Sequence, residues 1–245
     1  MLKYLKAIIL FLLPVPASRL LFKLFGVKNI TVGRGCRIGF SWITADRLVL
    51  ADGSQIGHFN YIDNVLTELG GGKIRHLNII KGSCEVVMQG RAWMNSQNKI
   101  SSGPGRNMSY VTRLLMCDGA SLIMKHTLDL SDHITIGPNT TLAGVGSQIW
   151  THAFYKSHSR AAKVIGSVRI GADCYIGSNV VICAGVNIAD GVAVGANATV
   201  SRDLTRPGLY VSQPLRFIEY NPDLAIDGLE PQTCPRGAYR KRRKE

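Results

Sequence analysis

A six-residue period in the C-terminal half of the chain constrains the fold more than any other feature. From Val168 the sequence divides into VRIGAD, CYIGSN, VVICAG, VNIADG, VAVGAN and ATVSRD. The third residue of each six is Ile or Val, and the fourth is Gly, Cys, Ala or Ser. Apolar residues two apart share one side of a strand, and a small residue after them permits a tight corner. The period therefore predicts a parallel β solenoid, in which strands and corners alternate and each coil stacks on the next.

Two weaker copies of the period precede this run. One extends from Val32 to Ile62 and the other from Leu122 to Leu142, and the second is displaced by two residues relative to the other runs. The displacement indicates insertions, so we expect loops near 66–112 and 147–163, with imperfect coils inside the first. Function is expected where an insertion interrupts a strict repeat.

The two ends of the chain differ from the repeat. The N-terminal segment, residues 1–28, is largely apolar, and prolines divide it into two short segments. Within 1–25 it has four basic residues that could meet anionic lipid (Lys3, Lys6, Arg19, Lys23). These segments are expected to form helices that cap the solenoid or lie on a membrane surface, and a cleaved signal peptide is the alternative. The solenoid domain is predicted over 29–218. Residues 219–245 form an extension whose basic tail is expected to be solvated.

Composition excludes several classes of protein. The chain has 245 residues, of which 46% are hydrophobic and 18% charged, so it is not a disordered chain. No apolar run reaches the roughly 20 residues that span a bilayer. The six cysteines are scattered without a CxxC pair, which argues against a zinc ribbon or a disulfide framework. The net charge of +13 suits an anionic partner, although the dispersed basic residues do not indicate nucleic acid.

The repeats resemble the hexapeptide motif, [LIV]-G-x4, of left-handed parallel β-helix acyltransferases. The resemblance covers roughly 30–218 and implies an all-β, left-handed parallel β-helix in which three sixes make one triangular coil. It is nearest to the sugar O-acetyltransferases of surface-polysaccharide and lipopolysaccharide synthesis, which have a histidine at the start of a projecting loop, then clean repeats and an NPA-type closing motif. Here the histidine is His152 in SQIWTHAF, and the closing segment LYVSQPLRFI (209–218) departs from that motif.

The resemblance implies that His152 is the catalytic general base. A sugar hydroxyl must lose its proton as it attacks a thioester, and a neutral imidazole can accept that proton and pass it to the leaving thiolate. No GxSxG motif is present, and no Cys–His pattern indicates a covalent intermediate. Four further residues are candidates for contacting the acceptor: Lys125, His126, Trp150 and His158.

The resemblance also implies acetyl-CoA or another acyl-CoA as the donor, with no metal ion. Matching the motifs residue by residue suggests five residues for binding it: Gly177, Gly195, Ser201, Arg202 and Arg216. The two glycines are 18 residues apart, one full coil, and serve equally well as corners that the fold requires. The two arginines offer cations for the phosphates of CoA.

The leading hypothesis is therefore transfer of an acetyl group from acetyl-CoA to a sugar hydroxyl of a cell-envelope polysaccharide or its lipid-linked precursor. N-acylation of a nucleotide-linked aminosugar and a nonenzymatic solenoid scaffold remain alternatives. A γ-type carbonic anhydrase is disfavoured, because the histidines lack the spacing of its metal site. Related enzymes are trimers, so we expect a homotrimer. Because acyl-CoA is a cytoplasmic donor, we expect a cytoplasmic protein, with peripheral contact at the inner membrane through residues 1–25 as a further expectation.

Overall fold

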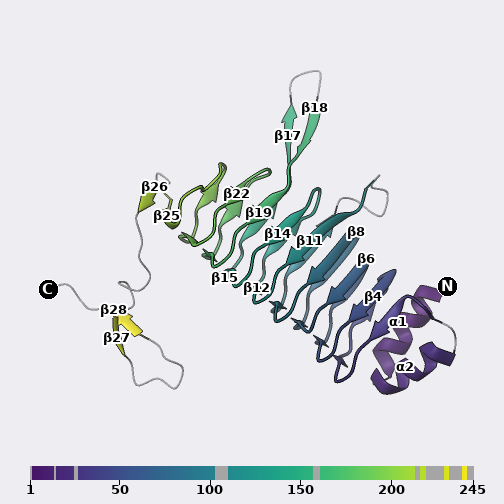
Figure 1. Cartoon of the computed structure of the whole chain (residues 1–245). Coiled ribbons are helices and arrows are strands. Elements are labelled where there is room, and N and C mark those ends of the chain that lie inside the picture. Colours follow the sequence, from purple (N-terminus) through teal and green to yellow (C-terminus); the bar gives the residue numbers. More distant parts are fainter. Residues whose placement is uncertain are drawn as a thin grey trace.

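The computed structural model is a long parallel β solenoid with two helices at its N-terminal end (Figure 1). It describes residues 2–13, 15–24, 27–102, 110–156, 161–212, 216–218, 229–231 and 239–241. The predicted all-β solenoid with a short N-terminal helical segment is confirmed.

Each coil has three sides, which we call faces B, A2 and A1 in the order in which the chain visits them. Face B is a 10-stranded sheet, and faces A2 and A1 belong to one 14-stranded sheet that continues around a corner. Two long strands, β6 (Tyr61–Leu69) and β8 (Ile79–Met88), run through both A2 and A1 and join them.

The remaining strands divide among the three faces. Face B contains β2 (Arg37–Ile38), β5 (Gln55–Ile56), β7 (Lys73–Ile74), β9 (Trp93–Met94), β12 (Ser121–Met124), β15 (Thr141–Val145), β20 (Tyr175–Ile176), β23 (Val192–Val194), β25 (Gly208–Val211) and the antiparallel β26 (Arg216–Ile218). Face A2 contains β3 (Trp42–Ile43), β10 (Lys99–Ser102), β13 (Thr127–Asp129), β16 (Gln148–Trp150), β21 (Val181–Ile182) and β24 (Thr199–Val200). Face A1 contains β1 (Ile30–Val32), β4 (Arg47–Leu50), β11 (Thr112–Met116), β14 (Ile134–Ile136), β19 (Val168–Ile170) and β22 (Asn187–Ile188).

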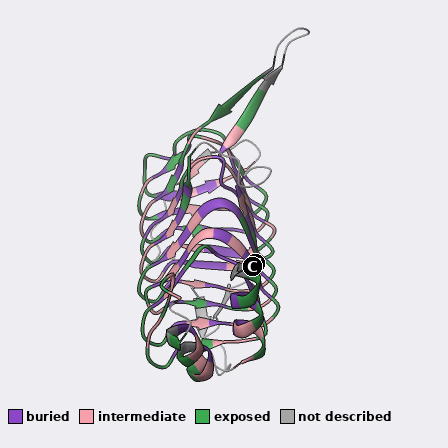
Figure 2. Cartoon of the chain, turned by 90° about the vertical axis from the view of Figure 1, so that its right-hand side faces the viewer, coloured by how far each residue is buried: buried purple, intermediate pink, exposed green. Residues whose placement is uncertain are grey.

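Two pairs of strands do not belong to the coils. Strands β17 (His152–Lys156) and β18 (Ala161–Ile165) pair antiparallel and form a hairpin that projects from the solenoid (Figures 1 and 2). Strands β27 (Leu229–Pro231) and β28 (Tyr239–Lys241) also pair antiparallel. The hairpin occupies the second insertion that the sequence predicts, near 147–163.

The inward residues of the repeat form the core. On face B, Ile56, Ile74, Met94 and Leu122 follow one another on successive coils, and each is at most 2% exposed. Figure 2, which views the coils from the N-terminal side, shows these buried segments inside the stack. Since each coil pairs only with its neighbours, the core is one continuous ladder rather than a globule.

Residues 66–102 form strands β6 to β10 and their corners, so the coils expected inside the loop region near 66–112 are present as far as residue 102. Residues 70–73, GGGK, form a corner in which Gly71 has a φ of 114°. A residue with a side chain is strained at that angle, so glycine permits the corner without breaking the coil. Residues 103–109, the rest of that expected loop, lie outside the described residues.

A ladder of polar side chains runs inside the corner between faces B and A2. The backbone N–H of Asn78 donates to Oδ1 of Asn60 over 2.9 Å, and that of Asn98 donates to Oδ1 of Asn78 over 2.8 Å. His126 continues the ladder, because its N–H donates to Oδ1 of Asn98 over 2.9 Å. These buried amides supply partners for backbone groups that turn away from the sheets at the corner.

The N-terminal helices are α1 (Leu2–Leu12) and α2 (Val15–Leu24). Leu10 and Phe22 are buried against the core, and α1 contacts β3. Lys6, which we expected to be free to meet lipid, is 8% exposed, and its Nζ donates to Oδ1 of Asn29 over 2.5 Å. This contact ties α1 to the first coil, so Lys6 is not a lipid-facing cation. The side chains of Lys3, Arg19 and Lys23 lie outside the described residues.

Candidate active site

An aspartate and a histidine meet at the corner between faces A2 and A1, where the hairpin leaves the solenoid. Asp129 ends β13 and lies beside Trp150 of β16 on the next coil. His152 follows two residues later, and its Nδ1 lies 2.7 Å from Oδ1 of Asp129. The side chains of His152 and Asp129 are 21% and 12% exposed, so the pair is shielded but remains open to a ligand.

The carboxylate of Asp129 is held by its own corner. The N–H of Ser131 donates to Oδ1 of Asp129 over 3.2 Å, and Oγ1 of Thr151 donates to the Asp129 carbonyl over 2.7 Å. Thr151 is fully buried and also accepts the N–H of Asp132 over 2.8 Å. The corner thus fixes the direction of the carboxylate before any substrate binds, as a preorganised site requires.

The contact with Asp129 determines which nitrogen of His152 is basic. An ionised carboxylate only accepts hydrogen bonds, so Nδ1 carries the proton and donates it to Asp129. In the neutral ring, Nε2 then has a free lone pair and can accept a proton. A protonated ring would be stabilised by the same carboxylate. The arrangement is therefore that of a general base with an orienting acid.

Four other side chains complete the surroundings of the imidazole. Trp150 and Phe154 meet the ring nearly at right angles, with ring centroids 5.9 Å and 5.5 Å away. Such edge-to-face contacts limit rotation of the imidazole. From β18, Nζ of Lys163 donates to Oγ of Ser131 over 2.9 Å, and this hydroxyl lies 3.2 Å from Nδ1 of His152. The hairpin therefore contributes an aromatic wall and a cation to the site.

The structure places two of the predicted donor-binding residues near this corner. Strand β16 pairs with β21, and β21 pairs with β24, so the ends of these strands stack at one corner. Ser201 and Arg202 follow β24 and therefore lie two coils beyond His152, about 10 Å along the axis at ordinary strand spacing. Both are exposed.

Gly177 and Gly195 lie at the other end of face A2, at the corner with face B. A Cβ on Gly177 would come within 2.8 Å of the Ala196 nitrogen, so glycine is required there by the packing of coils. A Cβ on Gly195 would approach Val211 to 3.3 Å. The two glycines stack on each other as their spacing predicts, but the structure does not bring them together with His152.

The residues predicted to contact the acceptor also lie at two different corners of the coil. Trp150 contacts the His152 ring, whereas Lys125 and His126 occupy the corner between faces B and A2. His126 is fully buried, its Nδ1 accepts the N–H of Ser147 over 3.1 Å, and its Nε2 lies 3.1 Å from the Leu142 carbonyl. Burial lowers the pKa of His126. A buried imidazole with both nitrogens bonded to backbone cannot contact an acceptor, so His126 is removed from that role.

The side chains of two predicted site residues are not among those that the structure describes. His158 lies outside the described residues, as does the side chain of Arg216, whose backbone is in β26. Across the described ranges, no group of three or more His, Cys, Asp or Glu side chains is arranged to hold a metal ion. Within the same ranges, no helix is long and apolar enough to cross a membrane.

Sequence reasoning missed Asp129, Ser131 and Lys163. Asp129 is 23 residues from His152, a separation that fits neither the six-residue period nor one coil of 18. The useful signal was the register of the repeat, because Asp129 directly follows the inward Leu128, and Trp150 directly follows the inward Ile149. Aligning the two strands would have placed the carboxylate beside the residues that precede His152.

Comparison with known proteins agrees with this architecture. Residues 167–202 match the family model described as bacterial transferase hexapeptide (six repeats). Galactoside O-acetyltransferase of Escherichia coli is 28% identical over 98 residues, which are 40% of this chain and 46% of that protein. UDP-3-O-acylglucosamine N-acyltransferase of Albidiferax ferrireducens is 29% identical over 93 residues, 38% of this chain and 23% of that protein. The chain therefore matches less than half of the length of either relative.

Among solved structures, an N-acyltransferase from Bacillus cereus in complex with dTDP and 3-hydroxybutyryl-CoA is similar at 16% identity. The alignment covers 84% of this chain and 90% of that chain, with a TM-score of 0.42. Residues 167–202 therefore match the hexapeptide repeat, and the chain has relatives among the acetyltransferases.

Proposed function

We propose that this protein transfers an acyl group, most simply acetyl, from acyl-CoA to a hydroxyl of a sugar in a cell-envelope polysaccharide or its precursor. The observation that carries the proposal is the 2.7 Å contact between Asp129 and His152 at the base of the hairpin. It gives the imidazole one basic nitrogen and a fixed direction, which deprotonating a sugar hydroxyl requires. A scaffold has no need of an oriented, partly open base.

In the proposed reaction, Nε2 of His152 removes the proton of the sugar hydroxyl as the oxygen attacks the thioester carbonyl. The resulting imidazolium is stabilised by Asp129, whose carboxylate faces Nδ1. When the tetrahedral intermediate collapses, the carbon–sulfur bond breaks and His152 returns the proton to the thiolate. The products are the O-acyl sugar and free CoA, and the base is regenerated.

The donor is proposed to lie along the corner that carries His152. Cys183, Ala184 and Gly185 follow β21 at this corner, and a Cβ on Gly185 would meet no atom within 4 Å. This open line of small residues suits a thin pantetheine arm. Arg202, exposed one coil further on, is proposed to bind the phosphates of CoA, with Ser201 beside it. Arg216 is kept as a second candidate for that role, whereas Gly177 and Gly195 are assigned to the fold.

Transfer to an amine is the second candidate, because one relative is by name an N-acyltransferase. The two products can be separated chemically. Purified protein is incubated with acetyl-CoA and a panel of sugars that offer hydroxyls, amines or both, and the products are treated with alkaline hydroxylamine. We expect a His152-dependent product that hydroxylamine cleaves, as it does esters. A product that resists hydroxylamine shows N-acylation, and no transfer to any acceptor supports the scaffold.

We further propose that α1 and α2 hold the protein at the surface of the inner membrane. Large apolar side chains are exposed on both helices, among them Leu5, Ile8 and Leu12 of α1 and Leu20 and Leu24 of α2. Such a surface suits the boundary between headgroups and acyl chains. The full chain should float with vesicles containing one third phosphatidylglycerol, and Leu12→Glu/Leu24→Glu should abolish flotation. A double variant that still floats excludes these helices as the contact. The homotrimer stays a prediction, to be checked by light scattering.

A further inference from the structure

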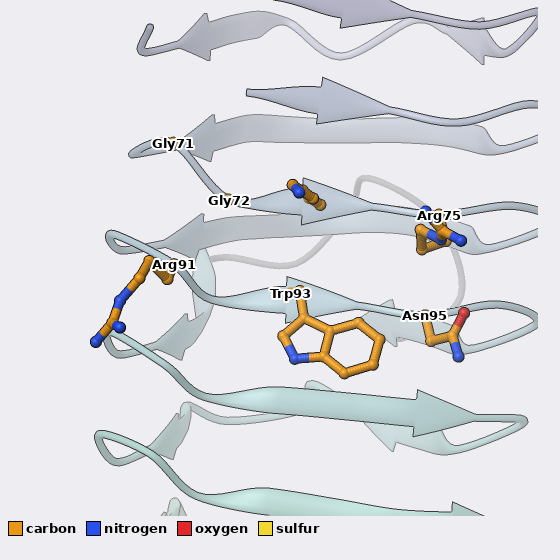
Figure 3. Close-up of a pocket in the computed structure, with 7 residues that line it drawn as sticks. Gly71, Gly72, Arg75, Arg91, Trp93 and Asn95 are labelled. Carbon is orange, nitrogen blue, oxygen red and sulfur yellow. The ribbon is translucent and has the colours of Figure 1, made fainter. Parts of the chain in front are cut away.

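Face B carries a cationic groove that the proposed chemistry does not use. A cavity of about 610 Å³ lies over strands β7 and β9, lined by Gly71, Gly72, Lys73, Arg75, Arg91, Trp93 and Asn95. Figure 3 shows the indole of Trp93 between Arg91 and Asn95, with Arg75 on the neighbouring coil. A second cavity of about 270 Å³ shares Lys73 and Arg75 and extends the surface to Arg37 on β2. The two cavities therefore form one continuous surface, which we call the face B groove.

The charges of this groove are largely unneutralised. Arg91 pairs with Asp118 over 3.2 Å, but both side chains are at least half exposed, so the pair contributes little and is easily exchanged. Arg37, Lys73 and Arg75 are exposed, and within the described part of the chain none has an acidic partner. Two cations on the β7 coil and one on the β2 coil, with the β5 coil between them, thus face solvent in a groove that also holds the Trp93 indole. Such a surface attracts an anion.

The groove is separate from the candidate active site. Face B lies opposite the corner between A2 and A1 that holds Asp129 and His152. Strand β9 is also two coils before β15, the face B strand of the His152 coil. A ligand in the groove therefore does not present its reacting hydroxyl to the His152 of the same chain. A role in holding a long ligand fits this position.

We infer that the face B groove binds an anionic glycan, one that carries carboxylates or phosphates on its sugars, as a holding site for the acceptor polymer. Arg37 and Lys73 occupy the same position on face B two coils apart, with Gln55 between them, which is a step of about 9.6 Å along the axis at ordinary strand spacing and suits a chain with repeated negative charges. The face of the Trp93 indole offers an apolar platform for the C–H side of a sugar ring, and Asn95 offers both a donor and an acceptor for hydroxyls. Among the described residues that line the groove, Trp93 is the one Trp, Tyr or Phe, whereas single-stranded nucleic acid is bound on several such platforms.

This inference rests on the proposed function in one respect, because it takes the bound polymer to be the acceptor of the acyl group. Binding is therefore tested without acetyl-CoA. The probe is a hexamer of galacturonic acid, with maltohexaose as the neutral hexamer, and binding is followed by calorimetry on the full chain. We expect the anionic hexamer to bind and to weaken as salt is raised, and the neutral hexamer to bind at least tenfold more weakly.

The variants locate the site. Lys73→Gln/Arg75→Gln should weaken the anionic hexamer about tenfold or more, and Trp93→Ala should weaken it as well. Arg47→Gln/Arg169→Gln removes the same charge from exposed strand positions on face A1 and should leave the affinity unchanged. Circular dichroism and thermal unfolding confirm that each variant is folded.

Three results would overturn the inference: no binding of the anionic hexamer, binding that both double variants weaken equally, or groove-dependent binding of UMP or anionic vesicles in place of the glycan. His152→Ala separates this inference from the proposed function. If it abolishes transfer and leaves hexamer binding intact, both proposals stand. If wild-type protein binds the hexamer but transfers nothing, the groove stands and the proposed function fails.

Discussion

Two coils of the same solenoid differ in one corner. From Ile176 to Val194 the chain completes a coil in 18 residues, and each face takes six. From Leu142 to Ile176 a coil takes 34 residues, although both ends occupy the same inward position on face B. The second coil has most of its additional length between Ile149 on face A2 and Ile170 on face A1, the stretch that forms the hairpin.

The coil before the hairpin also has additional residues at the corner between faces A2 and A1, although fewer of them. Leu128 and Ile136 are inward residues on faces A2 and A1, and they are eight residues apart rather than six. The additional residues widen the corner that holds Asp129 and Ser131. Inward apolar residues must stay in register to bury the core, so added length is tolerated only where the chain leaves the sheets. The comparison teaches that short corners support the fold, whereas the lengthened A2–A1 corner holds the candidate active site.

The largest effect is expected at the lengthened corner. His152→Ala should lower turnover by about 10² to 10⁴, the usual contribution of a general base, because the variant lacks the imidazole that Asp129 orients. The thermal midpoint should change little, since the imidazole is partly exposed. His133→Ala is the matched control, because His133 is an exposed corner histidine on the preceding coil. Equal losses in the two variants would remove the base from His152.

A change in a regular coil should produce the opposite result. Ile176 is fully buried in the core, so Ile176→Ala should reduce the free energy of unfolding by about 2–5 kcal/mol. Phe154 on the hairpin is 64% exposed, and Phe154→Ala should change that free energy by less than about 0.5 kcal/mol. Denaturant titration compares the two. If Phe154→Ala is the less stable variant, the conclusion that the regular coils rather than the hairpin stabilise the fold is wrong.

An intermediate effect is expected from the orienting acid. Asp129→Asn keeps the shape of the side chain, but its amide can donate to Nδ1 of His152 and favour the tautomer with the proton on Nε2. We expect turnover to fall about 10- to 100-fold with little change in KM for the acceptor. Asp173→Asn, at the exposed corner between faces A1 and B, provides the control. Unchanged turnover in Asp129→Asn would mean that the carboxylate has no part in positioning the base.

The sequence predicts the regular coils more completely than it predicts the lengthened corner. The period of Ile170, Ile176 and Ile182 predicts parallel strands and inward faces, because six residues with a small corner leave one way to stack. The position of His152 after a strand and before an insertion indicates the site. The register of the two strands indicates that Asp129 lies beside Trp150, but its contact with His152 could not be predicted, because it depends on the lengths of two corners, and corner length has no period. The same holds for Lys163, which reaches Ser131 only through the pairing of β17 with β18.

The smallest effect concerns a histidine that belongs to the fold. His126 is fully buried in the polar ladder, and burial lowers its pKa. In the unfolded chain its pKa returns to about 6.5, so below that pH the unfolded state takes up a proton that the folded state resists. The stability contributed by neutral His126 is therefore complete above about pH 6.5 and is lost as the pH falls towards the lower folded value.

The test of His126 compares how steeply the free energy of unfolding depends on pH in two proteins, rather than the free energies themselves. His126→Asn places in the ladder the residue type found at Asn98 and Asn78, which does not titrate. The variant should be less stable at pH 8, because the bond from the Ser147 N–H is lost, yet its free energy of unfolding should fall less between pH 7 and pH 5 than that of the wild type. Other groups titrate equally in both proteins, so the difference in slope belongs to His126. Parallel pH profiles would show that His126 titrates alike in the folded and unfolded chains. The ladder would then be open to water at this corner, and His126 would have to be reconsidered as an acceptor contact.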